Sequence, residues 1–314
     1  MNDVLQSSGL KVVGTRPVRP DGVEKVVGRA QFGGDAVMPG MIFGATVRSP
    51  HAHAKIVSID TSKAEALKGV KAVVTAADFP EITSEEAFVG EGPMNFRDLS
   101  DNLMARGKVL YDGHVVAAVA ATSQTIANEA AGLIEVKYEV LPHVIDEVEA
   151  MAAGAPVLHD DIFTGGVDPK PTTPSNVAKR QEFAKGDLDA GFAAADHIVE
   201  RTYKTAAVHQ GYIEPHACVA SWGSDGQCQI ICSSQGQFMV RAYSAKLLGV
   251  DIADIRVTPA EIGGGFGGKT LVYLEPLALG LSKKAGLPVR MVMTREEVFR
   301  GTGPTSGGTI NVKM

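Results

Sequence analysis

The stretch IRVTPAEIGGGFGGK (residues 255–269) determines how the rest of the sequence is interpreted. Its first half alternates like a β-strand, and its second half places five glycines around Phe266. Glycine adopts positive φ angles without strain and lets a ligand approach the backbone closely. Consecutive N–H groups in such a loop converge on an anion or an oxo group. We therefore predict a ligand-cradling loop at 263–269, with a purely structural glycine turn as the alternative.

The same glycines also satisfy the dinucleotide pattern G-x-G-x-x-G, through Gly263, Gly265 and Gly268. A strand-like run precedes the pattern and a helix is predicted after it, as a dinucleotide site requires. The next acidic residue that follows a strand is Glu296, which is later than the roughly 20-residue spacing of a ribose-binding carboxylate. Nicotinamide dinucleotide binding through GGGFGG is therefore an alternative function.

Two other polar residues stand where side chains often meet ligands. Gln235, in SSQGQ (233–237), lies between the strand-like CQIIC and a predicted helix. Free helix N–H groups gather at such junctions, although an ordinary polar helix N-terminus explains the residue equally well. Glu214, in YIEPHACVA (212–220), precedes a proline in an apolar stretch. It is either a buried functional carboxylate or a hydrogen-bonded structural one.

Composition excludes several classes of protein. The 314 residues are 45% hydrophobic and 21% charged, so a large core can form. Thirty Lys and Arg against 36 Asp and Glu give a net charge of −6, which argues against a nucleic-acid surface. No run approaches 18 consecutive apolar residues, and the opening MNDVLQSSGLKVVG lacks the order of a signal peptide. The expected location is the cytoplasm.

Neither cysteine nor histidine spacing predicts a metal held by protein side chains. Cys218, Cys228 and Cys232 match no zinc or iron–sulfur spacing, so they are interpreted as buried apolar residues. His51 and His53 have no third ligand nearby. We therefore predict neither a disulfide framework nor a protein-ligated metal.

The chain divides into four parts, and short strands mixed with a few helices indicate an α+β fold. The third part, the connector at 142–180, is predicted to be an ordered strap, because the apolar side chains of Val144, Val148 and Met151 have to be covered by other residues. Within the second part, Ser123 is expected to cap an amphipathic helix at 123–133. The parts are an extended segment at 1–20, a strand-rich block at 21–141, a proline-containing connector at 142–180 and a second block at 181–314.

The last residues, GTINVKM (308–314), alternate like a strand that has only begun. A strand without a neighbouring turn needs a pairing partner. We expect that partner on another polypeptide, or on a continuation of the chain.

From SSQGQ to GGGFGGK the sequence resembles the molybdenum-cofactor (large) subunit of the xanthine oxidase family of molybdenum hydroxylases. The resemblance covers about residues 11–314 and extends to an ordered set of motifs. These are GRAQFGGD (28–35), RSPHAHAKIVSID (48–60), GVKAVVTAADFP (69–80), YDGHVVAAVAA (111–121), EVKYEVLP (135–142) and GDLDAGFAAADHIVERTY (186–203).

The resemblance implies an α/β hammerhead-type domain followed by the first, incomplete part of a molybdopterin-binding α+β domain. In such a subunit the residue matching Gln235 approaches an oxo ligand of the metal, and that matching Phe266 borders the substrate. The loop glycines Gly264, Gly265, Gly267 and Gly268 match backbone that lies beside the cofactor. The cofactor is molybdenum held by the dithiolene of a pyranopterin, either molybdopterin or its cytosine dinucleotide form.

The implied activity is hydroxylation of an electron-poor carbon in an N-heterocycle, an aromatic compound or an aldehyde, with water as oxygen donor. Purine-oxidising members carry a glutamate where this chain has Thr270, so xanthine is not the expected substrate. GTGPTSGG (301–308) is similar to nicotinate-type dehydrogenases. No counterpart of the cysteine-bearing loop of carbon monoxide-oxidising members is found.

The resemblance also implies partners, because the glutamate that serves as general base in this family lies in a later motif without a counterpart here. The chain matches only the N-terminal half of the family's large subunit and is expected to be inactive alone. A second polypeptide would complete the molybdenum site, an iron–sulfur subunit would carry [2Fe-2S] clusters, and a further subunit would carry FAD. A non-catalytic assembly subunit of the same family is the remaining alternative.

Overall fold

The computed structural model describes residues 11–83, 86–89, 92–303 and 305–314. Its centre is a mixed sheet of seven strands in the order β12-β11-β10-β13-β1-β7-β3. The pairs β1–β13 and β11–β12 are parallel and the other neighbours are antiparallel. The strands are β1 (Ile42–Arg48), β3 (Val70–Thr75), β7 (Val115–Ala121), β10 (Ala217–Trp222), β11 (Cys228–Cys232), β12 (Ile255–Pro259) and β13 (Val289–Val292).

The two compositional blocks of the sequence share this sheet. Its first-block strands β3, β7 and β1 meet the second-block strands at the pair β1–β13, where Ile42 lies opposite Val289 and Phe43 opposite Arg290. The N–H of Ile42 also donates to the carbonyl of Pro288 at 2.8 Å. The blocks are therefore joined by backbone hydrogen bonds through the middle of the fold.

Strand β7 shows why an uninterrupted apolar run became a central strand. All seven residues of VVAAVAA are buried. Ala117 and Val119 pack on one face, towards the cluster under α3 (Ser62–Ala66) and α5 (Gln124–Leu133). Ala118 and Ala120 belong to the main core on the other face, beside α9 (Glu275–Ala285). A strand covered on both faces needs no polar alternation.

Helix α5 occupies the predicted range 123–133. Ser123 is its N-cap, and the Ser123 hydroxyl accepts a hydrogen bond from the N–H of Ile126. Helix α8 (Gln237–Leu248) connects the parallel strands β11 and β12, and it ends at Gly249 in the left-handed conformation. It packs on α4 (Phe96–Leu103), where the rings of Phe96 and Tyr243 lie 6.1 Å apart.

Smaller elements surround the main sheet. A three-stranded sheet contains β6, β2 and β8, and β4 pairs with β5 as a hairpin. Their bounds are β2 (Ala54–Asp60), β4 (Glu86–Val89), β5 (Gly92–Asn95), β6 (Lys108–Val109) and β8 (Glu135–Val140). The short helices are α2 (Gly22–Val26), η1 (Gly33–Asp35), η2 (Ala76–Asp78), α6 (Glu147–Ala150), α7 (Leu188–Ala193), η3 (Ile252–Asp254) and α10 (Arg295–Gly301).

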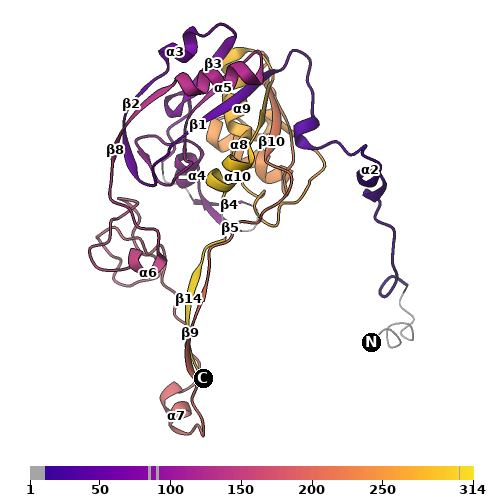
Figure 1. Ribbon diagram of the computed structural model, residues 1–314. Helices are drawn as coiled ribbons and strands as arrows, with labels where there is room; N and C mark the ends of the chain where they lie inside the picture. Colours follow the sequence, from indigo (N-terminus) through magenta and orange to yellow (C-terminus); the bar gives the residue numbers. More distant parts are fainter. Residues whose placement is uncertain (1–10, 84–85, 90–91, 304) are drawn as a thin grey trace.

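Strands β9 (Glu200–Thr205) and β14 (Gly308–Lys313) form a ribbon that projects from the body, with α7 beyond its end (Figure 1). Gly308 pairs with Thr205 and Lys313 with Glu200 in antiparallel register. The expectation that β14 pairs with another polypeptide is therefore wrong. Its partner lies about a hundred residues earlier in the chain, and no local sequence pattern records such a pairing.

The connector is ordered by polar bonds instead of apolar cover. Val148 and Met151 are exposed, so the prediction that they are covered is wrong. The Asn176 side chain holds the strap: its Oδ1 accepts from the N–H of Leu158 at 2.9 Å, and its Nδ2 donates to the carbonyls of Ala150 and Pro156. One partly buried amide thus replaces the expected apolar contacts.

The N-terminal segment leaves the body beside α2 (Figure 1). Residues 11–20 have exposed side chains, whereas residues 1–10 of the predicted extended segment and Pro304 of GTGPTSGG lie outside the described residues. Among the described residues, no helix has both the length and the apolar character needed to cross a membrane.

Candidate functional site

The glycine loop leaves β12 and turns sharply around Phe266. Gly264 and Gly267 have φ angles of 98° and 90°, and Phe266 itself has φ 48°. A bulky residue in the left-handed region is held there by its surroundings. The N–H of Gly268 closes the turn on the carbonyl of Gly265 at 2.7 Å. The turn leaves the Phe266 ring 73% exposed.

Gln235 ties this loop to the junction between β11 and α8. Its side-chain Oε1 accepts from the N–H groups of Gly267 at 3.0 Å and Lys269 at 3.1 Å. Its own N–H donates to the carbonyl of Lys269 at 2.9 Å. A Cβ on Gly265 would lie 2.4 Å from Gln235 Oε1, so only glycine permits this approach.

These bonds orient the Gln235 amide. Both neighbours of Oε1 are N–H donors, and the oxygen must therefore face them. The amide nitrogen Nε2 is left pointing away as a donor, and it has no hydrogen bond among the described residues. The expectation that loop N–H groups converge on a ligand needs correction for two of them, because those of Gly267 and Lys269 converge on the loop's own glutamine.

The side of the loop that faces the interior is formed by Tyr212, Glu214 and Lys269. Lys269 has no exposed side-chain surface, and its Nζ lies 2.7 Å from Glu214 Oε2. The same carboxylate oxygen accepts the N–H of Gly263 at 2.7 Å. Lys269 Nζ also lies 5.1 Å from the centre of the Tyr212 ring. Glu214 is thus a hydrogen-bonded carboxylate at the base of the loop.

A buried polar network continues behind Tyr212. The Tyr212 hydroxyl lies 2.7 Å from His216 Nε2 and 3.1 Å from Thr302 Oγ1. Thr302 donates its proton to the carbonyl of Val298. Burial lowers the pKa of His216 to about 3, with a smaller contribution from the Lys269 charge. Burial also lowers the pKa of Lys269, against the opposing effect of Glu214.

The predicted loop glycines fall into two groups. A Cβ on Gly264 would lie 3.1 Å from the Cβ of Tyr212, and one on Gly268 would lie 2.6 Å from its ring, so these glycines make room for that side chain. A Cβ on Gly267 would meet no atom within 4 Å. Among these loop positions Gly267, with Phe266, therefore presents open backbone for an approaching ligand.

The dinucleotide alternative does not fit this geometry. Residues 270–274 separate the glycine loop from α9, so the loop does not open onto a helix N-terminus. The first turn of α9 contains Pro276 and the buried Glu275. A phosphate has no free helix end to approach here.

The three cysteines are buried and free, as interpreted from the sequence. Burial raises the pKa of each thiol, that of Cys228 to about 11. His53 is buried with its Nδ1 2.8 Å from the carbonyl of Pro142. Within the part of the chain that the structure describes, no three His, Cys, Asp or Glu side chains are grouped to hold a metal ion.

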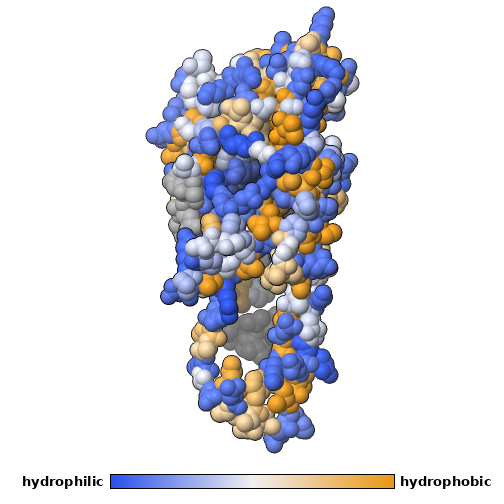
Figure 2. Space-filling view, turned by 90° about the vertical axis from the view of Figure 1, so that its left-hand side faces the viewer, coloured by the Kyte–Doolittle hydropathy of each residue, from blue (hydrophilic) through white to orange (hydrophobic). Residues whose placement is uncertain are grey.

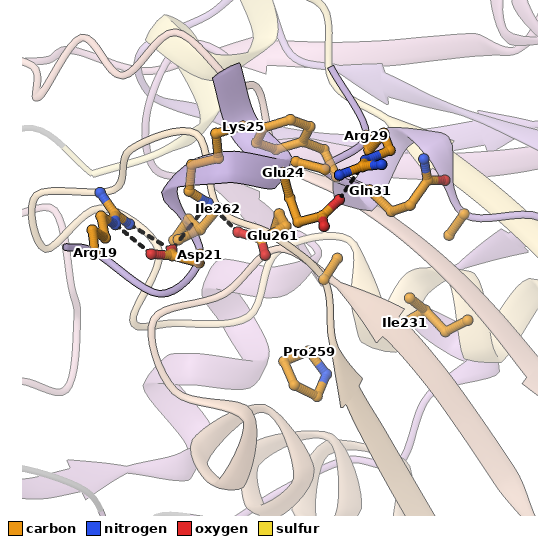
Figure 3. Close-up of a pocket in the computed structure, with 14 residues that line it drawn as sticks. Arg19, Asp21, Glu24, Lys25, Arg29, Gln31, Ile231, Pro259, Glu261 and Ile262 are labelled. Carbon is orange, nitrogen blue, oxygen red and sulfur yellow. Dashed lines mark hydrogen bonds and ion pairs between the residues drawn. The ribbon is translucent and has the colours of Figure 1, made fainter. Parts of the chain in front are cut away.

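Two cavities lie near the loop. One, of about 520 Å³, separates α2 from the end of β12 and the residues leading into the loop (Figure 3). Lys25 on α2 pairs there with Glu261, while Ile231 and Pro259 line the opposite side. The other, of about 880 Å³, is mostly apolar and includes Leu271 and Tyr273, just beyond the loop.

Sequence reasoning missed Lys269 and Tyr212 as parts of the site. Lys269 ends the glycine motif and is followed by the apolar run TLVYL. A cation at such a boundary is a signal that it is buried and paired. Tyr212 stands two residues before Glu214, but nothing in the sequence places its side chain against two glycines of the loop.

Comparison with known proteins matches both blocks of the chain. A family model described as "Aldehyde oxidase and xanthine dehydrogenase, a/b hammerhead domain" matches residues 27–142. A second, the molybdopterin cofactor-binding domain, matches residues 169–314.

Relatives match over almost the whole chain. The xanthine dehydrogenase molybdenum-binding subunit of Escherichia coli O157:H7 is 33% identical, over 95% of this chain and 38% of its own length. The nicotinate dehydrogenase large molybdopterin subunit of Eubacterium barkeri is 31% identical, over 91% of this chain and 62% of its own. The crystal structure of quinoline 2-oxidoreductase from Pseudomonas putida 86 is 30% identical with a TM-score of 0.82, over 95% of this chain and 37% of that one.

The chain thus spans a little over a third of the xanthine dehydrogenase relative that it matches. Along this chain the match to the hammerhead domain comes first and the match to the cofactor-binding domain follows it. This chain belongs to the molybdenum-cofactor subunits of the xanthine oxidase family.

Proposed function

We propose that the chain forms part of a molybdenum hydroxylase that oxidises an electron-poor carbon of a small molecule. The observation that carries this proposal is the Gln235 amide. Its oxygen is fixed by two backbone N–H groups, which leaves Nε2 as an oriented donor beside the open backbone of Gly267. A donor held in advance beside a site where charge develops is the arrangement that stabilises a transition state.

The residues present fit a molybdenum–pterin group. Such a group brings oxygen atoms that accept hydrogen bonds. Two donors of exposed residues have no partner among the described residues, Gln235 Nε2 and the N–H of Phe266. The absent side chain of Gly267 leaves room for close approach. Beside Gly268, the buried Oε1 of Gln210 has no hydrogen-bond partner among the described residues and supplies an acceptor.

When bound, the group supplies a two-electron redox centre at which water is the oxygen donor. This chain's part is to orient it. Gln235 would donate to an oxygen of the group, and the backbone at Phe266 and Gly267 would lie against it. The Phe266 ring, exposed in this structure, borders the substrate. Mass analysis of the pterin released from the complex distinguishes molybdopterin from its cytosine dinucleotide form.

An N-heterocycle, an aromatic compound or an aldehyde is the proposed substrate class. Position 270 offers no carboxylate to a purine, because it is a threonine. The Thr270 hydroxyl donates to the carbonyl of Gly267 at 2.9 Å. The cavity next to Leu271 and Tyr273 has a mostly apolar lining, which favours a small organic ring. Nicotinate dehydrogenase and quinoline 2-oxidoreductase are two of the similar proteins.

We further propose that the chain works within a complex of several subunits. The exposed Phe266 ring and the open backbone of Gly267 leave one side of the site without protein cover. An iron–sulfur subunit and an FAD subunit would accept the electrons. Residues 1–314 alone are therefore expected to be inactive, as a further polypeptide segment has to close the site and supply a general base.

Analysis of the purified complex that contains this chain tests the proposal. We expect about one molybdenum and one pterin per chain, and turnover of nicotinate, quinoline or an aromatic aldehyde with an artificial electron acceptor. Oxygen-18 from labelled water should enter the product. A complex without molybdenum that binds NAD through this chain would contradict the proposal. One that binds pterin but shows no turnover would favour a non-catalytic assembly role.

Gln235→Ala is the residue-level test. Loss of one well-placed donor typically lowers kcat on the order of 10²–10³-fold. Gln235 is exposed and α8 begins after it, so assembly should be affected much less than turnover. The measurement is kcat at matched molybdenum content. Equal kcat in the variant and the wild type would rule out the role assigned to Gln235.

A further inference from the structure

Lys269 contacts both the buried interior and the Gln235 amide. Its backbone N–H donates to Gln235 Oε1 at 3.1 Å, and its carbonyl accepts from the N–H of Gln235 at 2.9 Å. The same carbonyl accepts from the Ser234 hydroxyl at 3.1 Å. Its side chain runs inward to Glu214. Any displacement of Lys269 therefore displaces the oxygen that orients the Gln235 donor.

Glu214 anchors Lys269 to three parts of the fold at once. Oε2 binds Lys269 Nζ and the N–H of Gly263, both at 2.7 Å, which joins the two ends of the glycine loop. Oε1 lies 3.4 Å from the N–H of Gly33 on η1. The carboxylate thus connects the loop, its entry and η1.

A simple packing role does not explain a lysine at this position. Lys269 is fully buried and Glu214 is 11% exposed, so both charges are removed from water. Buried ion pairs often contribute less to stability than apolar residues of the same volume. They do fix a unique arrangement when their remaining hydrogen bonds are satisfied, as Glu214 is by Gly263.

We propose that Glu214 and Lys269 are positioning residues that hold the glycine loop and the Gln235 donor ready for the cofactor. The inference rests on the proposed function and extends it to the residues behind the Gln235 donor. Partners of this kind typically change cofactor affinity or activity about 10–100-fold when removed. Neither side chain is assigned contact with the substrate.

The test is the double variant Glu214→Gln/Lys269→Met in the purified complex. It removes both charges together, so no unpaired buried charge is left to unfold the chain. The matched control is Arg48→Met/Glu297→Gln, which removes another ion pair between a buried arginine and a partly buried glutamate. No hydrogen bond or ion pair joins Arg48 or Glu297 to residues 263–269 among the described residues.

Three measurements separate positioning from stability alone. Molybdenum and pterin per folded chain should fall about 10–100-fold in the test variant. In the molecules still loaded, kcat should fall while KM changes little. Hydrogen exchange at the Gly267 and Lys269 amides should quicken, since these two amides bind Gln235 Oε1. The control should match the wild type in all three.

Adding Gln235→Ala to the double variant tests directly whether the ion pair acts through Gln235. If the pair acts through Gln235, the charge-removing variant should lower kcat little further in the Gln235→Ala background. Full multiplication of the two effects would overturn the proposal, as would wild-type molybdenum content together with unchanged amide exchange. If the double variant does not accumulate, Lys269→Met alone leaves the partly exposed Glu214 carboxylate with the N–H groups of Gly263 and Gly33. It supplies the same readouts, with wild-type values again contradicting the proposal.

A failure of the proposed function remains distinguishable. If the wild-type complex carries no molybdenum, the proposed function fails. Amide exchange at Gly267 and Lys269 needs no cofactor, and it still decides whether the ion pair positions the loop.

Discussion

Two Lys–Glu ion pairs flank the glycine loop, one on each side. Lys269–Glu214 lies on the interior side, with side chains that are 0% and 11% exposed. Lys25–Glu261 lies on the outer side, in the cavity beside α2, with side chains that are 23% and 31% exposed (Figure 3). Each pair joins a lysine ammonium to a glutamate carboxylate, and the two pairs differ in their access to water.

Their different access to water determines how strongly each pair holds the parts of the chain that it joins. Water and salt screen the outer pair, which joins α2 to Glu261, between the end of β12 and the loop. The inner pair is screened little, and its carboxylate also binds backbone at Gly263 and Gly33. The inner side of the loop therefore tolerates few changes, whereas the outer side tolerates many.

A contrast between exposed and buried residues also separates the ribbon from the core of the sheet. The ribbon of β9 and β14 exposes Tyr203 and Ile310, and the residues before α7 expose Phe183. Figure 2 shows hydrophobic residues scattered among hydrophilic ones on the narrow part of the molecule, in contrast to the enclosed core of the sheet. Order in the ribbon comes from backbone pairing without burial.

The largest effect is expected from Glu214→Ala. The substitution leaves Lys269 charged, buried and unpaired, which should lower the free energy of unfolding by about 3–5 kcal/mol. Glu261→Ala on the outer side is the matched control and should change stability little. Urea unfolding of both variants checks this comparison. Equal losses would show that burial does not distinguish the two pairs.

Gly267→Val should have the next largest effect, on cofactor loading. The φ of 90° strains any side chain, and the added bulk fills the open space beside the loop. We expect molybdenum per chain to fall well below half. Gly286→Val is the control, because Gly286 also has a positive φ and no atom within 4 Å of an added Cβ, but it ends α9 away from the loop. Full occupancy in Gly267→Val would contradict this role.

Acid should weaken the interior side of the loop before the outer side. Burial lowers the pKa of His216 from 6.5 to about 3, so the unfolded chain binds a proton that the folded chain excludes. The stability that neutral His216 provides is complete above pH 6.5 and is lost as the pH falls from there towards 3. The loss is on the order of a few kcal/mol. Denaturant unfolding at about pH 7.5, 6 and 5 measures it.

The variant His216→Gln tests whether His216 causes this dependence of stability on pH. His216→Gln keeps a hydrogen-bonding side chain beside the Tyr212 hydroxyl but cannot titrate in this range. Its stability should depend less on pH than that of the wild type over the same interval. The same slope in both proteins would exclude His216 as its source.

The smallest effect is expected from Lys25→Met. Lys25 pairs with Glu261 and Asp21 at the solvent-exposed end of α2. Exposed pairs contribute little because water screens them. Thermal unfolding and molybdenum content should both stay within error of the wild type. A clear loss of molybdenum would mean that the outer pair also positions the loop.

Much of the fold follows from local pattern. VVAAVAA predicts a buried strand because an apolar run of that length needs cover on both faces, and β7 has that cover. Ser123 predicts the start of α5 because its hydroxyl can accept an N–H of the first turn. The glycine run predicts a sharp, ligand-accessible loop, and Gly264 and Gly267 take positive φ angles.

The wrong predictions concern strand pairing over a long sequence distance and the kind of contact that orders the connector. The partner of β14 is β9, which no local signal near 308–314 identifies. Val148 and Met151 stay exposed, because the Asn176 amide orders the strap in place of apolar contacts. In the loop, the N–H groups expected to face a ligand are partly taken by Gln235 Oε1.

By itself, the sequence identified most of the residues that could build the site: the glycines, Phe266, Gln235 and Glu214. Chemical type and local conformational freedom are properties of each residue and its near neighbours, so a sequence can express them. Only the tertiary structure decided that Glu214 and Lys269 meet, that they are buried, and that the Gln235 amide turns its nitrogen outward. Those facts depend on segments brought together across the sheet and on the removal of water from a charge, which no stretch of sequence specifies alone.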